Sequence, residues 1–214
     1  MNLRARTPEA KQEKKALILA AAKDLFFGKG FYGTKIEMIA KKAGVSTGTV
    51  YLYYKNKIEV YKALQDEGVD ILSEMISQVI SWPGMSALAK LSEVARTYYR
   101  FHTEYREFFD IMAILSATPQ DLKESDSEIS SIIDAKTHKL LKIIESVLLE
   151  GIEQNEFVDL DTWKTTNVFW GMLDGLILLA ERQNIENVIG VDLEDLIKHA
   201  LEMSFYGILK QNQG

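Results

Sequence analysis

The 214-residue sequence contains no cysteine, only three prolines and no long hydrophobic run. The absence of cysteine excludes a disulfide framework, a cysteine-ligated zinc or iron–sulfur site and a thiol nucleophile, and it fits a reducing compartment. Apolar runs such as residues 16–22 and 176–180 are far shorter than the roughly 20 residues that span a bilayer. Charged residues in the first thirty positions interrupt the apolar stretch that a secretory signal needs. We therefore expect a cytoplasmic protein without a membrane partner.

The charge is unevenly distributed along the chain. The net charge is −6, but residues 1–62 contain 13 Lys or Arg and 5 Asp or Glu, a net charge of +8. The remaining residues carry −14. A basic module on an acidic body is typical of a protein that binds a polyanion with one end only. Charge alone leaves an alternative, in which a solvated amphipathic helix carries the basic excess by chance.

The hydrophobic pattern predicts an all-α fold of about nine helices. Apolar residues recur at spacings of three and four, and no stretch alternates for long enough to form a strand. Side chains that cap helix N-termini predict the starts, and glycine or proline predicts the breaks. A Glu three residues after Thr34 and after Asn56 completes a capping box at each. The expected caps are Thr7, Thr34, Ser46, Asn56, Ser125, Asp161 and Asp192, and the expected breaks are Gly30, Gly44, Trp82-Pro83-Gly84 and Thr118-Pro119.

Two short helices joined by a tight turn are predicted early in the chain. The first covers residues 34–43 and the second residues 47–53. Gly44 tolerates a positive φ in the turn, and Ser46 caps the second helix. This arrangement is typical of a helix-turn-helix, whose second helix enters the major groove of DNA.

At this point the sequence resembles the tetracycline-repressor (TetR) family of transcriptional regulators. The family's His-Phe pair near the end of the third helix is here Tyr53-Tyr54, which keeps the aromatic character. The rest of the chain is similar to the family only in helix count and layout. The resemblance implies a helix-turn-helix DNA-binding domain at residues 1–55 and an effector-binding and dimerisation domain at residues 56–214. The matching motifs are Gly30-Phe31, Thr34, Ile39-Ala40, Ala43-Gly44-Val45-Ser46, Gly48-Thr49-Val50-Tyr51, Tyr53-Tyr54, Lys55-Asn56-Lys57 and Val60-Tyr61.

Residues of the helix-turn-helix region are expected to contact DNA. The hydroxyl groups of the N-caps Thr34 and Ser46, with the amides behind them, are placed to bind phosphate oxygens. Thr47 and Thr49 lie in the first turn of the recognition helix. Gly48 between them allows close approach to the groove. We expect base edges to be read by Thr47, Thr49 and Tyr53. Charge and aromatic hydroxyls at the DNA backbone are expected from Lys35, Tyr51, Tyr53, Lys55 and Lys57.

Several of these assignments have alternatives. Tyr51 and Tyr54 can instead pack in the core against neighbouring helices. Arg4 and Arg6 fit a flexible arm on the DNA backbone or in the minor groove, and a tail without DNA contact is the alternative.

A helix-turn-helix of this size reads few base pairs, so specificity on double-stranded DNA needs two copies on a palindromic operator. We therefore expect a homodimer. The resemblance implies that the last two long helices form a four-helix bundle between subunits. The alternative for each apolar candidate is the core of its own subunit. The candidate interface residues are Phe169, Gly171, Leu173, Gly175, Phe205, Ile208 and Leu209.

The acidic domain is expected to bind a small-molecule effector. The resemblance implies that a small, often apolar, ligand there changes the separation of the two DNA-binding modules and releases DNA, most simply as a repressor. Aromatic and Met side chains can line such a pocket, with His102 or Asp174 as an orienting group, and ordinary core packing is the alternative. No cofactor is expected. The candidate lining residues are Phe101, His102, Tyr105, Phe109, Met112, Trp170 and Asp174.

An enzyme is disfavoured. Residues 44–48 match G-x-S-x-G, but a nucleophile elbow needs a preceding strand, and here a helix precedes it. The three histidines, His102, His138 and His199, are far apart and form no metal-binding spacing, so no metal site is expected. The remaining alternative is a DNA-binding or architectural protein that needs no effector.

Overall fold

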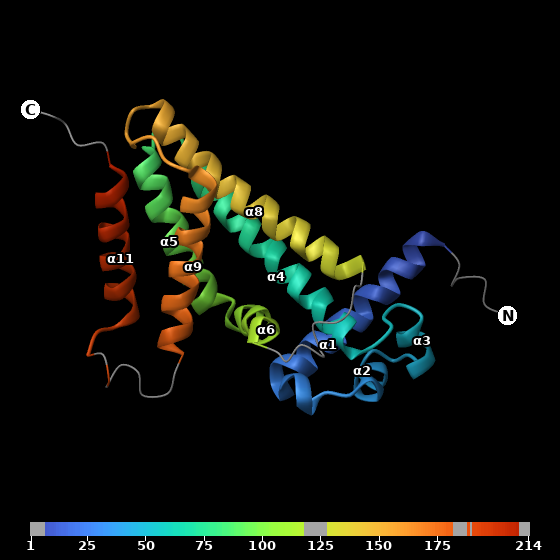
Figure 1. Cartoon of the computed structure of the whole chain (residues 1–214). Helices are drawn as coiled ribbons and strands as arrows, with labels where there is room; N and C mark the ends of the chain where they lie inside the picture. Colours follow the sequence, from blue (N-terminus) through green and yellow to red (C-terminus); the bar gives the residue numbers. More distant parts are fainter. Residues whose placement is uncertain (1–6, 118–127, 182–187, 189, 210–214) are drawn as a thin grey trace, which may run out of the picture. The chain divides into compact units, whose positions relative to one another are not determined.

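The computed structural model of the chain describes residues 7–117, 128–181, 188 and 190–209. Within these residues it contains nine helices and no strand, which confirms the predicted all-α class (Figure 1). A single isolated bridge joins Phe157 to Leu209. The helices are α1 (Pro8–Gly33), α2 (Ile36–Lys42), α3 (Thr47–Tyr51), α4 (Lys57–Ile80), α5 (Ala87–Glu104), α6 (Arg106–Ala117), α8 (Glu128–Glu153), α9 (Thr162–Ala180) and α11 (Leu193–Ile208).

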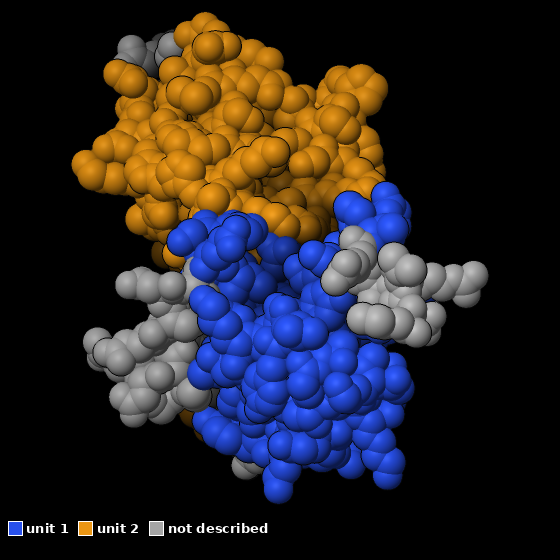
Figure 2. All heavy atoms as spheres, turned by 90° about the vertical axis from the view of Figure 1, so that its right-hand side faces the viewer, with its two compact units in different colours: residues 1–68, 110–133 blue, residues 69–109, 134–214 orange. Residues whose placement is uncertain are grey.

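The chain divides into two compact units (Figure 2). Unit 1 consists of residues 1–68 and 110–133, and unit 2 of residues 69–109 and 134–214. Unit 1 is therefore larger than the DNA-binding domain proposed from the sequence, because it also takes in the first turns of α4 and the segment from 110 to 133.

Unit 1 is built on a core in which α1 and α4 contribute most of the large side chains. Ile18, Ile39 and Leu64 are completely buried there. The ring of Tyr61 packs edge-on against the rings of Phe26 and Phe31, with centroids 5.0 Å apart in each pair. Burial of these apolar side chains fixes the helices that carry the turn between α2 and α3.

Unit 2 has a separate core shared by α5, α8 and α9. Leu91, Ile144 and Ile177 are buried almost completely. Gly151 lies against the ring of Phe157, and a Cβ at this glycine would clash with that ring. No helix in the described part of the chain is long and apolar enough to cross a membrane.

Most of the predicted helix caps are present. Thr7, Ser46, Asp161 and Asp192 each accept a hydrogen bond from the amide three residues later, at 2.9–3.2 Å. Asn56 Oδ1 accepts from the Glu59 amide at 2.9 Å. The cap predicted at Ser125, the break at Thr118-Pro119, and Arg4 and Arg6 lie outside the described residues.

The capping box predicted at Thr34 is wrong. Helix α2 begins at Ile36, its N-cap residue is Lys35, and no side chain caps it. The Thr34 hydroxyl donates instead to the carbonyl oxygens of Leu25 at 3.1 Å and Gly30 at 2.9 Å. Gly30 has a φ of 69°, which interrupts α1 and brings Thr34 back onto its carbonyl groups. Because Thr34 is fully buried, its side chain is not available to a phosphate.

Candidate DNA-binding helix and effector domain

The turn between α2 and α3 is held by backbone geometry and a small apolar core. Gly44 has a φ of 66°, as expected from its position in the turn. The Val45 amide donates to the Ala40 carbonyl oxygen at 3.0 Å. Ala40 and Val50 are buried and Val45 packs against the same cluster, which confirms the predicted internal core. This contact fixes the angle at which α3 leaves α2.

Helix α3 presents small polar side chains in its first turn. Ser46 Oγ accepts a hydrogen bond from the Thr49 amide at 3.1 Å and lies 2.8 Å from Thr49 Oγ1. Ser46 and Gly48 are exposed, and Thr47 and Thr49 are partly exposed. The first turn of a recognition helix carries the side chains that contact base edges. Here that turn has no bulky side chain that would hold the backbone away from DNA.

The tyrosines after this turn separate into surface and core residues. Tyr51 is 51% exposed, whereas Tyr54 is 3% exposed and belongs to the core of unit 1. Tyr53 is partly buried and packs against that core. The Tyr54 hydroxyl is buried without a hydrogen-bond partner in the described structure, and burial raises the pKa of this phenol to about 12. Tyr51 is thus available to DNA, and Tyr54 is not.

Two of the predicted phosphate-binding lysines are accessible. Lys35 is exposed at the start of α2. The Lys55 side chain is 81% exposed, and its Nζ lies 3.9 Å from Glu59 Oε1. An exposed ion pair of this length leaves the ammonium group available for a phosphate oxygen.

Lys57 occupies a different place from the one predicted. Its Nζ donates to the carbonyl oxygens of Phe31 at 2.8 Å and Thr34 at 3.0 Å. The same atom lies 4.0 Å from the centroid of the Phe31 ring, and burial lowers the pKa of this ammonium group. The expectation of a free phosphate-binding cation is therefore corrected, because the ammonium group is bonded inside unit 1.

The residues predicted to line an effector pocket are mostly engaged with one another. Phe101, His102 and Phe109 are buried in unit 2. Asp174 accepts a 2.6 Å hydrogen bond from the Tyr98 hydroxyl. Burial and, to a smaller extent, the negative charge of Asp174 raise the pKa of the Tyr98 phenol.

The other members of this set follow the same pattern. His102 Nε2 lies 2.6 Å from Glu181 Oε1, and the other carboxylate oxygen, Oε2, pairs with Arg106. Tyr105 stacks on Phe101, with ring centroids 5.7 Å apart, and the Trp170 ring packs on Tyr98 at 4.5 Å. Met112 is assigned to unit 1. These side chains thus pack and hydrogen-bond with neighbours in the described part of the chain, and the pocket expected from them stays a prediction.

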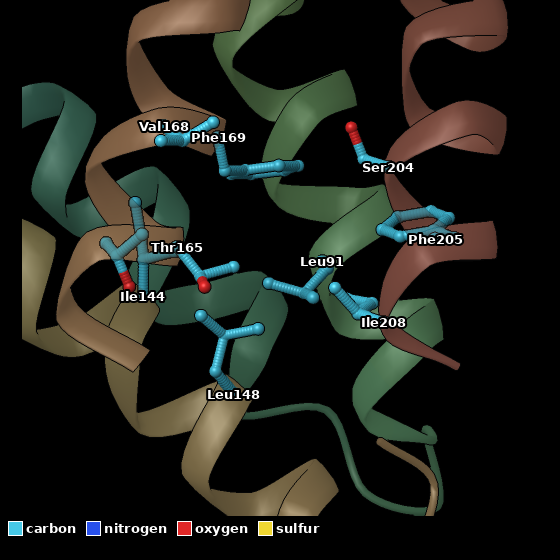
Figure 3. Close-up of a pocket in the computed structure, with 10 residues that line it drawn as sticks. Leu91, Ile144, Leu148, Thr165, Val168, Phe169, Ser204, Phe205 and Ile208 are labelled. Carbon is cyan, nitrogen blue, oxygen red and sulfur yellow. The ribbon is translucent and has the colours of Figure 1, made fainter. Parts of the chain in front are cut away.

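A cavity of about 170 Å³ lies elsewhere in unit 2, between α5, α8, α9 and α11 (Figure 3). The rings of Phe169 and Phe205 project into the space between α9 and α11, from one helix each. The lining contains no charged side chain and consists of Leu91, Ile144, Leu148, Thr165, Thr166, Val168, Phe169, Ser204, Phe205 and Ile208. The sequence analysis named Phe169, Phe205 and Ile208 only as interface candidates, and it did not predict the site because the other lining residues have the types and spacing of an ordinary core.

The candidate interface residues divide between the core and the surface. Phe169 and Leu173 are 7% and 0% exposed within their own chain, which favours the alternative that they belong to the core of their own subunit. Phe205, Ile208 and Leu209 are partly buried. Gly171 and Gly175 are exposed, and nothing lies within 4 Å of a Cβ built at either.

Large apolar side chains are exposed on the same two helices. Val168 of α9 is 71% exposed, and Met203 and Tyr206 of α11 are 66% and 77% exposed. We name these three residues, with Gly171 and Gly175, the α9/α11 face. In the described part of the chain, no three His, Cys, Asp or Glu side chains are grouped to hold a metal ion.

Helix α3 is exposed and capped, and the turn from α2 holds it in place. This arrangement defines a helix-turn-helix DNA-binding regulator. The family model for bacterial regulatory proteins of the tetR family matches residues 18–64, which include α2, the turn and α3. The fatty acid metabolism regulator protein of Bacillus subtilis strain 168 is 27% identical over 199 residues, which cover 92% of this chain and 97% of the relative. Residues 18–64 thus match the tetR-family helix-turn-helix, and over most of its length the chain is similar to a curated transcriptional regulator.

Solved structures share the fold over nearly the whole chain. The regulator FadR from Bacillus subtilis, solved in complex with stearoyl-CoA, has a TM-score of 0.64 and 25% identity, and the match covers 90% of this chain and 98% of that one. A protein of unknown function from Rhodococcus sp. RHA1 has a TM-score of 0.74 at 17% identity, with coverage of 92% and 96%. The helices of both units therefore follow an arrangement found in other members of the fold.

Proposed function

We propose that this protein is a repressor that binds a palindromic operator as a homodimer and is released from it by a small, largely apolar effector. The observation that carries the DNA-binding part is the first turn of α3, in which Ser46, Thr47 and Gly48 present small groups at the surface. Binding to chromosomal DNA places the protein in the bacterial cytoplasm.

The α9/α11 face supports the homodimer. Exposed Val168, Met203 and Tyr206 form apolar surface that a partner subunit can bury, and Gly171 and Gly175 let a second helix approach closely. A symmetric pair joined at this face presents two copies of α3, as a palindrome requires.

The effector part is supported by the uncharged cavity of unit 2 and by the relatives. A Bacillus subtilis regulator that is 25% identical to this chain was solved with stearoyl-CoA, and the curated match from the same species is named for fatty acid metabolism. An apolar ligand that prefers one arrangement of the dimer shifts the DNA affinity by a coupling free energy, typically about 1–3 kcal/mol.

Selection of bound sequences from a random duplex pool, read at two salt concentrations, tests the proposed function. We expect recovery of a palindrome that persists at the higher salt concentration. Binding that is sequence-independent and lost at high salt would contradict the operator, because phosphate contacts alone carry no sequence information.

A further inference from the structure

We propose that the cavity between α5, α8, α9 and α11 binds a short acyl group of about four to six carbons, with the Thr165 hydroxyl donating to its carbonyl oxygen. The inference deepens the effector part of the proposed function and rests on it. Four features of the cavity carry it: its size, its lack of charge, the partners of its hydroxyl groups and its place beside the α9/α11 face.

The size of the cavity sets the length of the ligand. An engineered protein cavity of about 150 Å³ holds one benzene molecule, and the cavity here measures about 170 Å³. Six or so carbon atoms fill it. The eighteen-carbon chain of stearoyl-CoA, which the Bacillus subtilis FadR binds, needs roughly three times that space.

The walls of the cavity select an uncharged group. Its floor is apolar, with Leu91, Ile144 and Leu148 each at most 2% exposed. Burying a free carboxylate among such side chains carries a large desolvation cost. A thioester or ester carbonyl is neutral, so the acyl group enters the cavity and the coenzyme A portion stays outside.

The hydroxyl groups of the lining differ in their partners. The Thr166 hydroxyl donates to the Thr162 carbonyl oxygen at 2.9 Å, and the Ser204 hydroxyl to the Ala200 carbonyl oxygen at 2.8 Å. The Thr165 hydroxyl has no hydrogen-bond partner among the described residues, and it is drawn beside the open space in Figure 3. It is therefore the donor that a ligand carbonyl can use without breaking a helix hydrogen bond.

The position of the cavity links the ligand to dimer geometry. Val168 both lines the cavity and belongs to the α9/α11 face. Phe205 lies on α11, the helix that also carries Met203 and Tyr206. An acyl group that separates α9 from α11 changes the surface offered to the partner subunit, and this is the differential contact that coupling requires.

The test uses the full-length protein and two ligand series, acyl-CoA thioesters and free fatty acids with 2, 4, 6, 8, 12 and 18 carbons. Binding is measured by thermal shift and calorimetry, and release by fluorescence anisotropy of the selected operator. We expect the tightest binding at about four to six carbons among the thioesters and at least tenfold weaker binding of the matching free acids.

Two variants and a matched control locate the site. Thr165→Val keeps the shape and removes the donor, so affinity for hexanoyl-CoA should fall about tenfold. Phe169→Ala enlarges the cavity and should move the preference to longer chains. Thr103→Val is the control, because Thr103 is exposed on α5 and its hydroxyl donates to the Arg100 carbonyl oxygen. It should bind like the parent.

The outcomes separate this inference from the proposed function. Three results would overturn the short-acyl site. The parent binds stearoyl-CoA as tightly as hexanoyl-CoA or more tightly, Phe169→Ala leaves the chain-length order unchanged, or a protein that still binds its operator binds no short thioester. Tight, Thr165-dependent binding of hexanoyl-CoA without release of DNA supports the site and contradicts effector release. Failure to bind any operator contradicts the proposed function alone, since ligand binding is measured without DNA.

Discussion

The Lys57 ammonium group and the Phe31 carbonyl oxygen are joined by a 2.8 Å hydrogen bond that ties the start of α4 to the end of α1. A second bond runs to the Thr34 carbonyl oxygen, and the Phe31 ring lies beneath the charge. Helix α1 packs against α2. The hydrogen bonds of Lys57 therefore help to position the helix-turn-helix by holding the end of α1 in place. This contact explains why a lysine beside the recognition helix is built into the fold and is not left for a phosphate.

Lys57→Met should therefore act through stability. We expect the free energy of unfolding to fall by about 1–3 kcal/mol, because two buried carbonyl oxygens lose a charged donor. DNA affinity should drop with little change in its salt dependence. Lys55→Ala is the matched comparison because Lys55 is exposed. This variant should lower the salt slope by about one without loss of stability. Urea unfolding and DNA titrations at several salt concentrations check both variants. A reduced salt slope in Lys57→Met would show that Lys57 does contact a phosphate.

Gly48→Ala should separate stability from DNA binding. Gly48 lies inside α3, and its Cβ would meet nothing closer than Ser46 Oγ at 3.8 Å. Alanine therefore fits the fold and should raise the stability of unit 1 by up to about 1 kcal/mol. If α3 approaches the groove closely at this glycine, operator affinity should fall at least tenfold. Operator affinity equal to that of the parent would show that Gly48 does not face DNA.

Tyr54→Phe should stabilise the protein and change its response to alkali. Removing a buried hydroxyl without a partner should add about 1 kcal/mol to the free energy of unfolding at neutral pH. The folded-state pKa is raised from 10.0 to about 12, so the stability from keeping this phenol neutral is complete below pH 10 and is lost as pH rises toward 12.

The phenylalanine variant should lack that part of the alkaline loss, about 1.4 kcal/mol per pH unit within the window. Urea unfolding of both proteins at pH 7, 10, 11 and 12 checks the difference. A constant difference across these pH values would mean that the Tyr54 hydroxyl is hydrated in solution.

Replacing Gly171 by Leu tests the α9/α11 face. A Cβ built at this exposed glycine has no atom within 4 Å, so we expect leucine to fit its own chain and to block close approach of a second α9. We expect the dimer dissociation constant to rise at least tenfold, as measured by analytical ultracentrifugation. Gly28→Leu is the control, because Gly28 is equally open but lies on α1 of unit 1. An unchanged dimer in Gly171→Leu would move the interface to another surface.

Local capping signals in the sequence predicted much of the fold. Ser46, Asp161 and Asp192 cap as expected because the acceptor and the amide lie three residues apart. Thr34 has the same local pattern, yet its hydroxyl bonds to carbonyl groups of α1, and only the tertiary structure brings those within reach. Sequence spacing does not reveal such competition.

The effector domain was harder to predict for a related reason. Aromatic side chains with Asp174 suggested a pocket, and the structure shows that Asp174 already accepts a hydrogen bond from Tyr98. The cavity described above is lined instead by residues such as Leu148 and Thr165, whose types and spacing are those of an ordinary core. A cavity arises where helices fail to fill space between them, and no single residue signals it.

We expect two copies of this chain to read one palindrome through their α3 helices. The most direct measurement compares operator affinity with that of a duplex in which the half-sites are moved apart by half a helical turn, about 5 base pairs. We predict two chains per duplex on the native spacing and a loss of affinity of at least a hundredfold on the altered one. Equal affinity for both duplexes, or one chain bound per operator, would contradict it.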